Sequence, residues 1–89
     1  MNSNILKALK AFKLSIKDIL NVEENEKELT YKVFLGKGKG CLLLEGHTEE
    51  VRRKRQRDGS LSFFRIQLPE PAYRVRWNSG SWVNLAEEE

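Results

Sequence analysis

The chain has 89 residues, which is the size of one small domain. Hydrophobic residues make up 39% and charged residues 33% of it, a balance that excludes collagen-like, coiled-coil and low-complexity classes. The longest apolar run, Cys41–Leu44, is far shorter than the roughly 20 residues that a transmembrane helix needs. We therefore expect a single domain over residues 1–89 and no association with a membrane.

The chain contains one cysteine, Cys41, so it cannot form an internal disulfide. This usage is typical of a reducing compartment, and we predict a cytoplasmic protein. Lysines interrupt the apolar residues of the N-terminal segment at Lys7, Lys10, Lys13 and Lys17. The segment therefore lacks the continuous apolar region of a secretory signal.

The net charge of +3 hides a strong segregation along the chain. Residues 1–19 carry +3 and residues 20–50 carry −3, whereas residues 51–77 hold seven arginines and one lysine against two acidic residues. All the arginines lie between Arg52 and Arg76. Because a guanidinium group is a planar fork of donors that suits phosphate and carboxylate, this cluster predicts an anionic partner.

The first predicted element is an amphipathic helix, which we place within residues 1–18. Its apolar residues recur at helical spacing with lysines between them. They are Ile5, Leu6, Leu9, Phe12 and Ile16. Asn2 or Ser3 can cap it, because a short side-chain oxygen accepts from the free amides of the first turn. The pair Ser15 and Asp18 could start a second short helix, but we favour a bend that leads into a strand.

From Ile19 onward the pattern changes to short strands separated by turns. Ile19–Glu23 and Leu29–Leu35 predict a hairpin, because the second run alternates apolar and polar residues. Gly36–Gly40 is expected to form a turn, and Cys41–Leu44 a buried strand. Glu45 and Gly46 then predict a second break.

Residues 48–57 fit either a helix capped by Thr48 or a strand. A helix would have Val51 as its only apolar anchor, whereas Asp58-Gly59 is a strong hairpin signal. We favour a strand that pairs with Leu61–Leu68.

Pro69 and Pro71 are expected to end that strand, and Tyr73–Trp77 and Trp82–Leu85 predict a last hairpin. If Ser79 and Gly80 are its two turn residues, Trp77 lies opposite Trp82 and both belong to the core. The predicted fold class is α+β: one N-terminal helix packed on a curved antiparallel sheet, or on a small partly open β-barrel, of five or six short strands. The segments are a helix over 1–18, an antiparallel meander over 19–86 and an acidic tail over 87–89.

A two-residue turn at Asp58-Gly59 would fix the pairing of the basic hairpin. Arg53 would then face Phe64, and Arg55 would face Ser62, on a side that we expect to contact the core. The other side would place Arg52 opposite Arg65 and Lys54 opposite Phe63. Cations around an exposed ring are typical of proteins that bind single-stranded nucleic acid.

These patterns favour a small non-enzymatic domain that binds nucleic acid, with single-stranded RNA or DNA preferred. The candidate binding residues are Arg52, Arg53, Lys54, Arg55, Arg57, Phe63, Arg65, Arg74 and Arg76. A second hypothesis is a protein-interaction module, such as a small inhibitor or accessory subunit, that docks the same hairpin on an acidic surface. The oligomeric state is not predicted.

Sequence motifs for catalysis or cofactors are weak. Gly36–Gly40 lacks the spacing of a phosphate-binding loop, and an apolar run rather than a helix follows it. Cys41 and His47 are the only thiol and the only imidazole, too few for a structural zinc site. We expect Cys41 to be a small buried residue, and we expect no enzyme activity, no metal and no cofactor.

Overall fold

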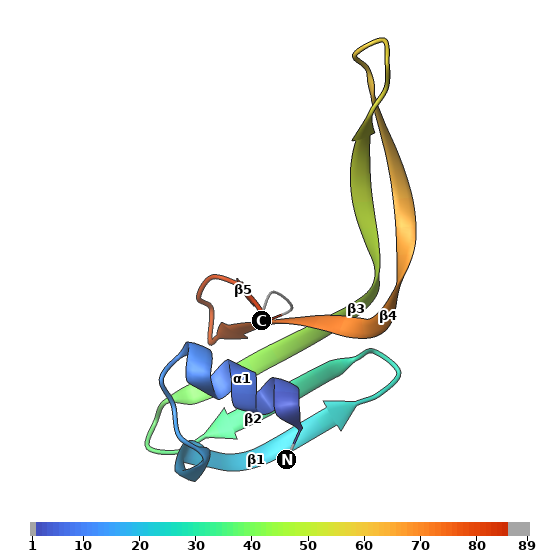
Figure 1. Ribbon diagram of the computed structural model, residues 1–89. Coiled ribbons are helices and arrows are strands. Elements are labelled where there is room, and N and C mark those ends of the chain that lie inside the picture. Colours follow the sequence, from blue (N-terminus) through green and yellow to red (C-terminus); the bar gives the residue numbers. More distant parts are fainter. Residues whose placement is uncertain (1, 86–89) are drawn as a thin grey trace.

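The computed structural model describes residues 2–85 and shows one helix beside a five-stranded antiparallel sheet (Figure 1). The elements are α1 (Ser3–Ala11), the 3-10 turn η1 (Ile16–Asp18), β1 (Ile19–Asn25), β2 (Thr30–Leu35), β3 (Gly40–Arg55), β4 (Leu61–Trp77) and β5 (Val83–Asn84). The strand order in the sheet follows the sequence, and the sheet is open. The α+β class is therefore confirmed. No helix within residues 2–85 is long and apolar enough to cross a membrane.

Helix α1 buries one face on the sheet. Asn2 is its N-cap, and its side-chain oxygen accepts from the backbone N–H of Asn4 at 2.7 Å. Ile5, Ala8 and Leu9 are buried. The helix ends at Ala11, so the predicted extent over 1–18 is wrong. The chain turns out of the helix at once, with a positive φ of 58° at Lys13.

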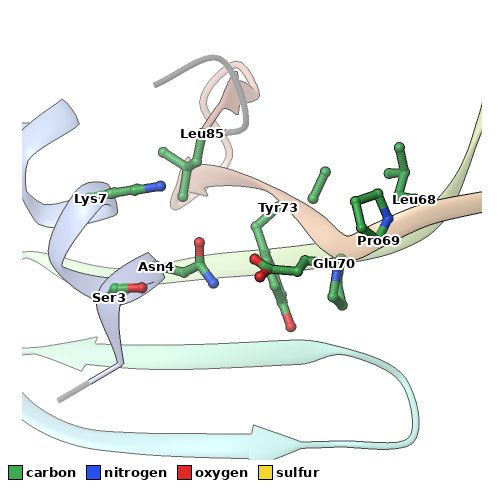
Figure 2. A pocket seen from close by; sticks show the side chains of 10 residues that line it. Ser3, Asn4, Lys7, Leu68, Pro69, Glu70, Tyr73 and Leu85 are labelled. Atoms are coloured by element: carbon green, nitrogen blue, oxygen red, sulfur yellow. The ribbon is translucent and has the colours of Figure 1, made fainter. Parts of the chain in front are cut away.

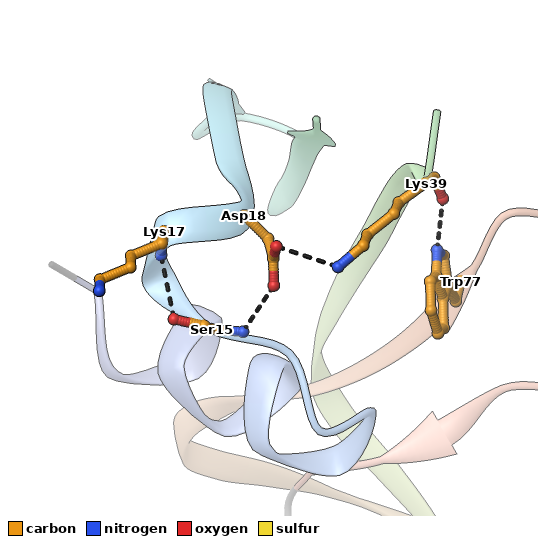
Figure 3. A network of polar contacts seen from close by, with 5 residues as sticks. All are labelled: Ser15, Lys17, Asp18, Lys39 and Trp77. Carbon is orange, nitrogen blue, oxygen red and sulfur yellow. Dashed lines mark hydrogen bonds and ion pairs between the residues drawn. The ribbon is translucent and has the colours of Figure 1, made fainter. Parts of the chain in front are cut away.

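The capping pattern at residues 15–18 forms a single 3-10 turn rather than the predicted bend (Figure 3). Ser15 Oγ accepts from the N–H of Lys17 at 3.2 Å, and Asp18 Oδ2 accepts from the N–H of Ser15 at 2.9 Å. Asp18 Oδ1 also pairs with Lys39 Nζ at 3.0 Å. The hydrogen bond from the backbone N–H of Ser15, and after it the one from the side chain of Lys39, lower the pKa of Asp18 below its usual value.

The core lies between α1 and one face of the central strands. The predicted hairpin of β1 and β2 is present, and Tyr31, Val33 and Leu35 alternate toward this core. The other buried strand residues are Leu42, Leu44, Tyr73, Val75 and Leu85. Cys41 is half-buried and does not belong to this cluster, so the expectation of a buried cysteine is wrong.

Strands β3 and β4 are long, 16 and 17 residues, which corrects the expectation of short strands throughout. Residues 48–55 form a strand, as favoured, but no break occurs at Gly46. A Cβ atom at Gly46 would lie 2.7 Å from Cε1 of Tyr73, the residue opposite it. This glycine therefore gives the Tyr73 ring room to lie across the strand.

The predicted pairing of the two tryptophans is wrong by one residue. Arg74 pairs with Asn84 and Val75 with Val83, a register that differs by one residue from the one predicted, and residues 78–82 separate the two strands. Trp77 packs against the core as expected, with its ring 5.6 Å from that of Phe12. A shift of one residue reverses the faces of a strand, and Trp82 consequently lies on the other side, above Arg74.

Gly46→Ala should lower the free energy of unfolding by roughly 1–3 kcal/mol, because the new methyl group displaces the buried Tyr73 ring. Gly36→Ala is the matched control, since its Cβ would make ordinary contacts of 3.5 Å with Leu20 and its φ is not positive. Urea denaturation followed by tryptophan fluorescence measures both. Equal stability of the two variants would show that Gly46 is not needed for the packing of Tyr73.

Asp18→Asn should destabilise the protein at neutral pH, because the neutral amide cannot pair with Lys39. The pKa of Asp18 is lowered by folding, so its charge stabilises the fold above the usual aspartate pKa, and this contribution is lost as the pH falls through the folded pKa. The stability gap between the parent and Asp18→Asn should therefore shrink below about pH 4. Denaturant titrations at several pH values test this, and a gap that stays constant would contradict it.

Candidate nucleic-acid interface

The arginine-rich hairpin projects from the rest of the molecule (Figure 1). We call residues 47–72 the arm and the remaining described residues the body. No residue of the arm is buried, whereas the body contains the whole core. The structure is 57 Å long and 24 Å in each of the other two directions. Because the arm has only two strands, its side chains contribute little to a core.

A register shift separates the arm from the body. His47 pairs with Ala72 and Glu49 with Gln67, so a single residue of β3 faces four residues of β4. Those four, 68–71, include both prolines, which have no N–H to donate to the ladder. The prolines therefore lie at a bend within β4 and do not end the strand as predicted.

A shallow cavity of about 390 Å³ lies at this bend (Figure 2). Ser3, Asn4 and Lys7 of α1 line one side, and residues 68–73 together with Leu85 line the other. The cavity marks the place where the arm leaves the helix-covered sheet. It contains none of the candidate binding residues.

The turn at the tip of the arm has three residues, Arg57, Asp58 and Gly59. The N–H of Gln56 donates to the carbonyl of Ser60 at 2.7 Å, and Gly59 has a φ of +90°. Asp58 Oδ1 accepts from the N–H and the hydroxyl of Ser60, and these bonds lower its pKa. The predicted two-residue turn is therefore wrong, and the pairing is shifted by one residue.

This shift redistributes the side chains between the two faces of the arm. The first face carries Val51, Arg53, Arg55, Leu61, Phe63 and Arg65. The second face carries Arg52, Lys54, Ser62, Phe64 and Ile66. Two contacts agree with this assignment: Arg65 pairs with Glu49 at 3.5 Å on the first face, and Arg52 with Glu50 at 3.1 Å on the second.

Neither face of the arm contacts the core, which corrects the prediction that the Phe64 side does. Phe64 is 45% exposed, and Phe63 is 64% exposed. All the arm's cationic residues are exposed. Cations therefore project from both sides of the ribbon, where one basic side was expected.

The cations nearest the tip are the least neutralised. Within residues 2–85, Arg53, Lys54 and Arg57 take part in no ion pair, and Arg55 donates only to the carbonyl of Gly59 at 3.2 Å. The two acidic partners, Glu49 and Glu50, lie at the root of the arm. These pairs are exposed and hence weak.

Arg74 and Arg76 belong to the body part of β4, beyond the bend, so the structure does not bring them together with the arm residues. Arg74 donates to Glu45 at 2.9 Å. The guanidinium carbons of Arg74 and Arg76 lie 4.0 and 5.0 Å from the centre of the Trp82 ring. The sequence analysis did not predict the contact of Trp82 with these arginines, because it placed the Trp82 ring in the core, on the face of the sheet opposite to them.

The residues considered for catalysis or metal binding do not converge. Cys41 and His47 lie six positions apart on one extended strand, a separation of roughly 20 Å. Within residues 2–85, no group of three or more His, Cys, Asp or Glu side chains is placed to hold a metal ion.

Comparison with protein families, curated proteins and solved structures gave no significant match.

Proposed function

We propose that this protein binds nucleic acid through the arm and catalyses no reaction. The observation that carries the proposal is the charge of the arm's distal part: residues 51–65 hold five arginines and one lysine against one aspartate, on a ribbon with no buried residue. Such a concentration of positive charge costs free energy through self-repulsion. An anionic partner would remove this cost.

Nucleic acid fits this charge because phosphates are densely spaced and bring condensed counterions. Contact with lysine and arginine releases those counterions, and this release favours binding without regard to sequence. Arg53, Lys54, Arg55 and Arg57 are available for such contacts, since none is held by a carboxylate within residues 2–85. Arg52 and Arg65 would exchange weak exposed pairs for phosphates.

The body would support the arm rather than bind directly. We propose that its sheet curves around α1 as a partly open barrel in the cytoplasm and holds the root of the arm. Arg74 and Arg76, stacked beside Trp82, would add positive charge for a nucleic acid that extends past the bend. Phe63, 64% exposed between cations, would stack on an unpaired base where one is present.

One observation favours a second candidate, a partner protein with an acidic surface. Val51, Leu61 and Phe63 are 59%, 46% and 64% exposed and share the first face of the arm with cations. Apolar side chains beside arginines are typical of protein interfaces. Capture of a partner from nuclease-treated lysate, lost in an arm variant that still folds, would support this candidate.

Arg53→Glu combined with Arg55→Glu should abolish nucleic-acid binding, because the change replaces two available cations by two anions. Fluorescence anisotropy with labelled single-stranded RNA, single-stranded DNA and duplex DNA measures it, after removal of copurified nucleic acid. For the parent, we expect dissociation constants of about 1–100 µM near physiological salt and a steep loss of affinity as salt is raised.

The matched control is Lys17→Glu combined with Lys27→Glu, which changes the net charge equally at two exposed positions of the body. We expect this control to keep most of the parent's affinity. Equal losses in the two variants would show that net charge, not the arm, determines binding. Absence of binding by the parent to every probe, even at low salt, would refute the proposal.

A further inference from the structure

We infer that the arm enters the major groove of B-form duplex DNA with its tip first. The two faces of the arm then contact the phosphates of the two DNA strands, one face to each strand. This inference rests on the proposed function and specifies its partner. It differs from the sequence-based preference for single strands, which rested on cations around the exposed ring of Phe63.

The distribution of charge between the faces is the first reason. Arg53, Arg55 and Arg65 project from one side of the ribbon, and Arg52 and Lys54 project from the other. A single strand or a flat acidic surface would contact one side and leave the other in water. A groove with phosphates along both walls contacts both sides at once.

The width of the groove that a two-stranded ribbon needs is the second reason. The major groove of B-form DNA is about 12 Å wide and admits a two-stranded ribbon, whereas the minor groove is about 6 Å wide. The major groove of duplex RNA is too deep and narrow for protein side chains to read. Of the regular duplexes, B-form DNA therefore offers the opening that fits the arm.

The depth of the major groove and the positions of the cations along the arm agree with entry by the tip. A groove about 8.5 Å deep accommodates two to three residues of each strand at about 3.3 Å per residue. Arg57 in the turn would then lie at the level of the bases. Lys54 and Arg55, which project from opposite faces, would lie near the rim, where the phosphates are. Arginine forms paired hydrogen bonds with the N7 and O6 atoms of guanine.

Asp58 is the one acidic residue of the tip, and its carboxylate is already engaged. It accepts from the N–H of Ser60 at 3.0 Å and from the hydroxyl at 2.6 Å. These bonds hold the three-residue turn in shape. Asp58 thus stabilises the conformation that presents Arg57 at the end of the arm.

The first test uses the full chain and three labelled probes of equal length: duplex DNA, one of its strands alone, and duplex RNA of the same sequence. Anisotropy at near-physiological salt should show duplex DNA bound about tenfold more tightly than the other two probes. Bulky substituents on C5 of the pyrimidines, which fill the major groove, should weaken binding. A ligand that occupies the minor groove should not.

The second test compares the two faces. Arg53→Gln with Arg55→Gln removes two charges from the first face, and Arg52→Gln with Lys54→Gln removes two from the second. Both variants should lose affinity for duplex DNA, and each should reduce the slope of log affinity against log salt by up to about 1.8. Lys17→Gln with Lys27→Gln is the control and should keep the parent slope.

The outcomes separate the inference from the proposed function. Single-stranded DNA bound as tightly as duplex, loss of affinity in one face variant only, or competition by the minor-groove ligand would overturn groove entry while nucleic-acid binding stands. Failure of all three probes to bind at any salt concentration would refute both. Preference for duplex DNA with equal losses in the two face variants supports both.

Discussion

The register shift between β3 and β4 is the constraint on which the rest of the structure depends. One residue of β3 faces four residues of β4 at this point, and two of the four are prolines that cannot donate to the ladder. On one side of the shift the two strands belong to a sheet that α1 covers, and Gly46 accommodates the ring of Tyr73. On the other side the same strands continue without a covering layer. Without the shift, the basic residues would lie on a simple extension of the body.

This division separates the residues that stabilise the fold from those available to a partner. Every buried residue lies in the body, and the contacts that fix its edges, such as Asp18 with Lys39 and the Trp77 indole with the Lys39 carbonyl, also lie there. The arm is held by its ladder and by the hydrogen bonds of its turn. Substitutions at its exposed cations therefore change charge with little effect on packing, since exposed positions away from such features alter stability little.

The sequence predicted much of the fold and the composition of the candidate site, but not the geometry of that site. Helical spacing, the strand periodicity of Tyr31, Val33 and Leu35, and the arginine cluster are local signals, and each was interpreted correctly as to element type. Both errors of register came from turns. Asp58-Gly59 and Ser79-Gly80 each suggested two turn residues, but the turn of the arm has three and residues 78–82 separate β4 from β5. Because strands have a period of two, a shift of one residue moved Trp82 onto the arginine side. Phe64 lies away from the core for another reason, since the arm continues without a covering layer. Turn length is decided by tertiary pairing, which these dipeptides do not encode.

The acidic residues of the arm make its positive charge uneven, with less net charge at the root than near the tip. Glu49 and Glu50 pair with Arg65 and Arg52 at the root, so the positive charge there is partly compensated. Arg53, Lys54, Arg55 and Arg57, nearer the tip, have no such partner within residues 2–85. The acidic loop of β1 and β2, with Glu24, Glu26 and Glu28, belongs to the body and repels a polyanion. Within the arm, the cations without a carboxylate partner therefore lie toward the end that is farthest from the core. An anionic partner would meet the turn before it meets the body, and this order of contact is the one that entry by the tip requires.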